Sequence, residues 1–75
     1  MKEGLLWYDS QGDIGLEERI SSAVKFFESK YGYLPNKCFV NPITLEKPLE
    51  LKRKIKILPS DRVMINHIWL EFSQK

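Results

Sequence analysis

One stretch of the chain, residues 15–32, has the apolar spacing of a helix, and it limits what the rest of the chain can form. Its apolar side chains recur every three or four residues, so they fall on one stripe of a helix. The stripe consists of Leu16, Ile20, Ala23, Val24, Phe27 and Tyr31. Gly15 is the expected N-cap, with Asp13 as the alternative, and Gly32 is the expected left-handed C-cap. Residues 16–31 are therefore predicted to form the single long helix.

The other apolar segments have the length and pattern of strands. Residues 5–8 and 38–40 are short and rich in aromatic or branched side chains, residues 49–58 alternate with period two, and residues 63–72 are apolar on both faces. Arg53 interrupts the apolar side of 49–58, so a strand that starts near Lys54 is the alternative there. The order β-α-β-β-β predicts an α+β fold in two layers, with one helix packed on one face of a small mixed sheet of about four strands. The first two strands should be parallel neighbours or near-neighbours, because a helix connects them. We expect a single domain, 1–75.

The predicted strands carry more apolar side chains than one helix can cover. Adjacent strand residues point to opposite faces, so only one of Trp7 and Tyr8 can lie beneath the helix, and only one of Ile68 and Trp69. Exposed aromatic side chains gathered on a small protein typically mark an interface. Unless an unrecognised turn covers the far face, the pattern predicts a homodimer, or binding of another protein, through the sheet face opposite the helix. The candidate interface residues are Trp7, Tyr8, Phe26 and Trp69.

Basic residues concentrate in one segment. Residues 47–62 contain six Lys or Arg and two Asp or Glu, although the net charge of the whole chain is only +2. In the predicted strand 49–58, Lys52, Lys54 and Lys56 would form a row able to follow the phosphates of a nucleic acid. No aromatic residue interleaves with the row to stack bases, and lysines on an edge strand also prevent edge-to-edge pairing. Nucleic-acid binding is therefore the alternative function.

Four polar residues fall at predicted strand ends, where binding loops are often displayed. They are Asn36, Asn41, Asn66 and His67. The structural alternative is that these side chains satisfy turn backbone, which asparagine does readily beside proline. His67 and Cys38 could form a thiol–imidazole pair, but nucleophilic catalysis also needs hydrogen-bond contact, an orienting group and an oxyanion site. The sequence offers no such set, so we expect a protein that is not an enzyme.

Cofactor and membrane motifs are also missing from the sequence. One cysteine and one histidine are too few for a structural zinc site, and the glycines form no phosphate-binding loop, so no metal or cofactor is expected. The longest apolar run has four residues, too short for a membrane span or a signal peptide. A single cysteine suits a reducing compartment. The expected location is the cytoplasm, with no membrane partner.

Three short motifs carry a resemblance to other proteins. They are Tyr31-Gly32, the run from Pro35 to Val40, and Asn66-His67-Ile68-Trp69. In these the sequence resembles small bacterial proteins of uncharacterised function, which share an opening close to Leu-Trp-Tyr-Asp, one helix ending in Tyr-Gly, and a closing Asn-His-x-Trp strand. The resemblance covers most of the chain and implies one compact domain. It implies no activity, cofactor or site residue.

Overall fold

The computed structural model describes residues 4–8, 15–51 and 54–72. Its one described helix, α1 (Leu16–Tyr31), has the predicted bounds. Gly15 is the N-cap, and Gly32 takes the left-handed conformation at φ 83°. The Gly32 N–H donates to the Glu28 carbonyl at 2.8 Å, so one of the last free carbonyls of the helix is satisfied. Asp13, the alternative cap, lies outside the described residues.

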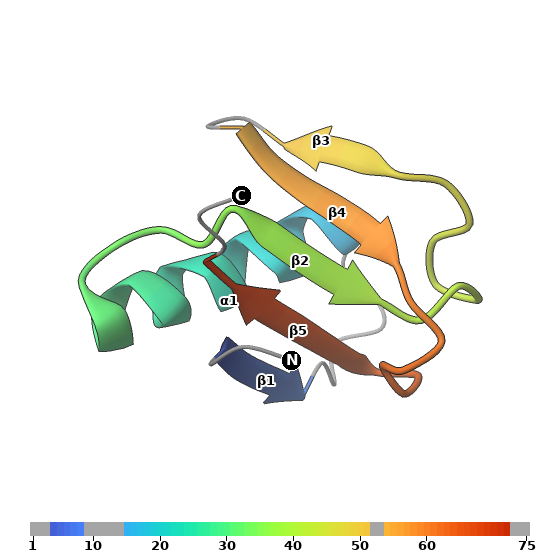
Figure 1. The fold of residues 1–75 in the computed structure, drawn as a ribbon, viewed down its shortest axis with the longest axis horizontal. Coiled ribbons are helices and arrows are strands. Elements are labelled where there is room, and N and C mark those ends of the chain that lie inside the picture. Colours follow the sequence, from blue (N-terminus) through green and yellow to red (C-terminus); the bar gives the residue numbers. More distant parts are fainter. Residues whose placement is uncertain (1–3, 9–14, 52–53, 73–75) are drawn as a thin grey trace.

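Five strands form one sheet behind which α1 lies (Figure 1). They are β1 (Gly4–Tyr8), β2 (Lys37–Val40), β3 (Leu49–Leu51), β4 (Ile55–Pro59) and β5 (His67–Glu71). Their order across the sheet is β1-β5-β2-β4-β3. The β2–β4 pair is parallel and the other pairs are antiparallel. The predicted α+β fold is confirmed, with five strands in place of about four.

The two strands that flank the helix in sequence are near-neighbours, as predicted. β5 lies between β1 and β2 and is antiparallel to both, so β1 and β2 run parallel to each other. The last strand of the chain therefore fills the gap that the helical connection leaves open. This position of β5 between β1 and β2 decides which side chains lie beside one another on each face of the sheet.

The extra strand comes from the segment 49–58, where one continuous strand was the wrong prediction and the alternative of a strand that starts near Lys54 agrees with β4. β3 ends at Leu51, β4 begins at Ile55, and the two strands pair antiparallel with Leu51 opposite Ile55. Lys54 has a positive φ of 62°, the left-handed conformation that reverses the chain before β4. The segment is therefore a β-hairpin.

The last strand is shorter than predicted. β5 begins at His67 and not at Val63, because the His67 N–H donates to the Met64 carbonyl at 3.1 Å and closes a turn. Asn66 occupies the third position of this turn with φ 69°. Asparagine tolerates that conformation better than other non-glycine residues, and a type II turn requires it there.

The core lies between α1 and the sheet face behind β2 and β5 in Figure 1. The helix contributes Ile20, Ala23, Val24 and Phe27, and the sheet contributes Cys38, Val40, Ile55, Ile57, Ile68 and Leu70. Leu16 and Tyr31 pack at its margin, so all six residues of the predicted stripe face the sheet. Trp7 packs against the core while Tyr8 is 63% exposed, and Ile68 is buried while Trp69 points away. One member of each adjacent pair thus lies beneath the helix, as predicted.

Candidate protein interface on the open sheet face

The sheet face opposite α1 is called the open face, because no described helix or strand lies over it (Figure 1). An apolar row crosses four of its strands. Trp69 on β5 lies between Leu6 on β1 and Phe39 on β2, and Phe39 in turn lies beside Leu58 on β4. Leu6 is 56% exposed, and the other three side chains are half-buried. Neighbouring strands thus assemble one apolar band from residues far apart in the sequence.

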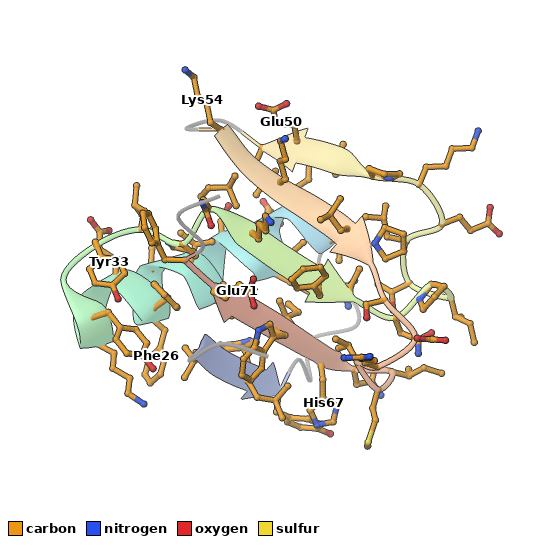
Figure 2. The ribbon with its side chains drawn as sticks, in the orientation of Figure 1. Phe26, Tyr33, Glu50, Lys54, His67 and Glu71 are labelled. Atoms are coloured by element: carbon orange, nitrogen blue, oxygen red, sulfur yellow. The ribbon has the colours of Figure 1, made fainter. Side chains whose placement is uncertain are left out.

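A charged row lies beside the apolar row, toward the start of β2. Glu71 on β5 is opposite Lys37 on β2, Lys37 is opposite Lys56 on β4, and Lys56 is opposite Glu50 on β3. Figure 2 shows Glu50 on β3 and Glu71 on β5, with β2 and β4 between these two strands. The row therefore reads acid, base, base, acid across the sheet. Glu71 is buried, with only 8% of its surface exposed.

Trp69 is fixed in place at the junction of the two rows. Its indole N–H donates to Glu71 Oε1 at 3.0 Å. Its ring lies over Gly4, where a Cβ atom would stand 2.5 Å from Trp69 Cζ2. On the other side of β1, the Tyr31 hydroxyl donates to the Gly4 carbonyl at 3.2 Å. Gly4 in the edge strand β1 thus makes room for the indole, and Tyr31 of α1 holds Gly4 from the helix side.

His67 and Tyr8 occupy the opposite end of the open face. Their rings meet edge to face with centroids 5.3 Å apart. His67 Nδ1 donates to the Ile65 carbonyl at 3.0 Å, which fixes the ring in the tautomer that carries its proton there. A shallow pocket of about 280 Å³ opens beside them. Its lining consists of Leu6, Arg62, Val63, Met64, His67 and Trp69.

The four aromatic interface candidates fall into two groups. Tyr8 and Trp69 lie on the open face. Trp7 and Phe26 lie on the helix side, where their ring centroids are 5.2 Å apart, and Figure 2 shows Phe26 beside α1. Sequence reasoning did not single out Leu6, Phe39 and Leu58, because only the strand order brings them beside Trp69. Their alternation within each strand is the one signal that was present.

The predicted row of lysines is not formed. Lys52 lies outside the described residues, and Lys54 stands at the hairpin turn, where its φ is 62°. Figure 2 shows Lys54 at the edge of the sheet. Lys56 lies on the open face of β4 between Lys37 and Glu50. The hairpin is the physical reason, because a row along one strand needs that strand to continue through residue 54. The positive side chains of the open face are instead a pair on adjacent strands.

The four polar candidates do not form one site. Asn36 precedes β2, whereas Asn41 follows it and reaches the turns before β5. The Asn41 amide donates to the Val63 carbonyl at 2.9 Å, and its Oδ1 accepts from the Ile43 N–H at 2.9 Å. Asn66 is exposed in its turn. The Asn41 side chain thus satisfies turn backbone, the structural alternative that the sequence left open, whereas Asn66 shapes its turn through its own left-handed backbone.

Cys38 and His67 face opposite sides of the sheet. Cys38 is fully buried beneath the helix, opposite Leu70, whereas His67 lies on the open face beside Tyr8. Burial raises the pKa of the Cys38 thiol to about 12. A thiol that stays protonated and never meets the imidazole cannot act as its nucleophile. The pair therefore carries no catalysis.

Comparisons of the chain with known proteins find no similar protein. No protein-family model matches the chain, and no curated protein or solved structure matches it. Within residues 4–8, 15–51 and 54–72, no three His, Cys, Asp or Glu side chains gather as a metal site. In the same part of the chain, no helix has the length and apolar character needed to cross a membrane. The open face is therefore the feature of the molecule that points to a function.

Proposed function

We propose that the protein is a non-catalytic interaction module that self-associates through the open face. The observation that carries the proposal is the apolar row of Leu6, Trp69, Phe39 and Leu58 on a face without a described covering element. A contiguous apolar surface that stays in water is unusual on a soluble monomer and typically marks an interface. A second copy of the chain can cover the row with the same surface, so one patch serves both partners.

The size of the chain supports self-association. A domain of 75 residues has a small core, and oligomerisation is one of the usual ways by which such domains gain stability. The module acts in the cytoplasm, where a lone thiol such as Cys38 stays reduced.

Analytical ultracentrifugation tests the proposal. We expect the wild-type protein to sediment as a dimer at micromolar concentration, and its Trp emission to shift red on dilution because Trp69 becomes exposed to water. Leu6→Glu introduces a charge into the apolar row and should give a monomer near 8.9 kDa. Ile43→Glu is the matched control, because Ile43 is 78% exposed outside the strands and should leave the dimer intact. A wild-type species near 8.9 kDa at every accessible concentration would contradict self-association.

Binding of single-stranded nucleic acid is the second candidate. The observation in its favour is that Lys37 and Lys56 lie on the same face as Phe39 and Trp69. The lysine pair and the aromatic pair are successive cross-strand pairs on that face. Single strands are bound by positive grooves that follow phosphates and by aromatic side chains on which bases stack. The sheet thus provides the aromatic neighbours that the basic segment itself lacks.

A further inference from the structure

The boundary between β2 and β5, called the seam, divides the open face into two halves with similar side chains. Across the seam Phe39 lies opposite Trp69, and Lys37 lies opposite Glu71. One level of the seam therefore carries two aromatic side chains, and the next level carries two opposite charges. Beyond the seam the pattern continues, because Leu6 lies beside Trp69 and Leu58 beside Phe39. The apolar row reads Leu, Trp, Phe, Leu, which is nearly the same in both directions.

A two-fold rotation uses this pattern directly. If two sheets pack face to face and the axis runs along the seam, each half of one face meets the other half of the second copy. β5 of one copy then lies over β2 of the other, and β1 of one copy lies over β4 of the other. Trp69 meets Phe39 of the second copy, Leu6 meets Leu58, and Glu71 meets Lys37. The strands of the two sheets stay nearly aligned, which is one of the two common ways for sheets to pack.

Axes along the other seams fit less well. An axis between β2 and β4 brings Lys37 against Lys56 of the second copy and Glu71 toward Glu50, so like charges oppose each other. An axis between β1 and β5 leaves half of the apolar row outside the overlap, and an axis between β4 and β3 leaves all of the row except Leu58 outside it. The seam between β2 and β5 both covers the whole row and opposes unlike charges.

Glu71 gives this arrangement its specificity. Its carboxylate is already largely buried and accepts one hydrogen bond from Trp69, so a covering partner removes most of its remaining water. A carboxylate closed into an interface needs an opposite charge nearby, because the desolvation cost is otherwise uncompensated. We propose that two copies pack face to face about a two-fold axis along the β2–β5 seam, with Glu71 of each copy paired with Lys37 of the other. This inference rests on the proposed self-association.

The pairing of Glu71 with Lys37 of the second copy is tested by two charge-reversal variants, measured alone and as a mixture of the two chains. Lys37→Glu gives a chain with acids at both positions, and Glu71→Lys gives a chain with bases at both. Each variant alone should dimerise at least about tenfold more weakly, because like charges then oppose each other twice. A mixture of the two should form heterodimers, since every opposed pair is again unlike. Native mass spectrometry separates the heterodimer from the homodimers when one chain carries a mass tag.

Glu50→Lys is the matched control for Glu71→Lys. Glu50 lies on the same face with the same charge, but β3 falls beyond the edge of the second sheet in this arrangement. Its reversal should leave the dimer affinity within about twofold of wild type, as expected for a charge outside the contact. Thermal melts of each variant monitor folding, since Glu71→Lys also removes the acceptor of the Trp69 indole.

A cross-linking experiment covers the case in which a charge reversal fails to fold. A short bismaleimide should link a Lys37→Cys chain to a Glu71→Cys chain in a mixture, and should not link either of them to a Glu50→Cys chain. A wild-type dimer without preferential heterodimers and without this cross-link would overturn the seam pairing and leave self-association standing. A wild-type monomer at every concentration would overturn both.

Discussion

Trp69 is the residue on which the open face depends. Its indole is held by the Glu71 carboxylate and by the space above Gly4, so the ring is fixed before any partner arrives. A pre-ordered aromatic side chain loses little conformational freedom on binding, which favours affinity. The sequence contains no local signal for this cluster, because Gly4 and Trp69 are far apart in the chain and meet only through the β1–β5 pairing.

The raised pKa of Cys38 predicts how fast its thiol reacts with a labelling reagent. Burial raises its thiol pKa from 9.0 to about 12, so the unfolded chain loses this proton first as the pH rises between those values. The stabilising contribution of the neutral thiol is complete below pH 9 and is lost as the pH rises toward 12. At pH 9 the folded protein holds only about one thiolate per thousand molecules. We expect slow labelling of Cys38 by a chromogenic disulfide at that pH, and fast labelling in denaturant.

Ser29→Cys provides the internal control for this measurement. Ser29 is exposed on α1, so the variant carries one accessible and one buried thiol in the same molecule. Two labelling phases of equal amplitude are expected, a fast one from position 29 and a slow one from Cys38. A single fast phase that accounts for both thiols would show that Cys38 is not enclosed by the core.

At the level of elements, adjacent phenylalanines on α1 give opposite expectations. Phe27 is 2% exposed in the core, whereas Phe26 is 48% exposed at its margin. Phe27→Ala should lower the free energy of unfolding by about 3–5 kcal/mol, which approaches the whole stability of a small domain. Phe26→Ala removes mainly the ring contact with Trp7 and should cost only about 0.5–1.5 kcal/mol. Urea unfolding measures both, and equal effects would mean that the helix faces the sheet with a different side.

The helix could be predicted from sequence and the hairpin could not, for physical reasons. A helix of 16 residues shows its period several times and is bounded by two glycines. In the hairpin, Leu51 and Ile55 are opposite each other and four positions apart, so both face the helix. Apolar alternation therefore keeps its phase through the turn, and Arg53 alone interrupts it. Lys54 takes the left-handed conformation without the glycine or asparagine that would announce it.

For the molecule as a whole, the two-sided apolar strands predicted an open face but only some of its members. Two features could be read from alternation alone, namely that Tyr8 and Trp69 point away from the helix side if Trp7 and Ile68 face it. The rest required the strand order, because β5 is the last described strand in the sequence yet lies inside the sheet, between β1 and β2. Phe39 and Leu58 become neighbours of Trp69 only through that topology.

The distribution of charge over the whole molecule supplies a test between the two proposed partners of the open face. If that face binds single-stranded nucleic acid, affinity for a fluorescent oligonucleotide should fall with salt, because bound phosphates release counterions. Replacing Lys37 and Lys56 by Gln should flatten the logarithmic slope by about 1.4, from about 0.7 for each phosphate contact on a single strand. The control pair Lys25→Gln and Lys30→Gln removes equal charge from α1 and should leave the slope nearly unchanged. Equal flattening by both pairs would indicate a diffuse effect of net charge, and no binding at low salt would leave self-association as the function of the face.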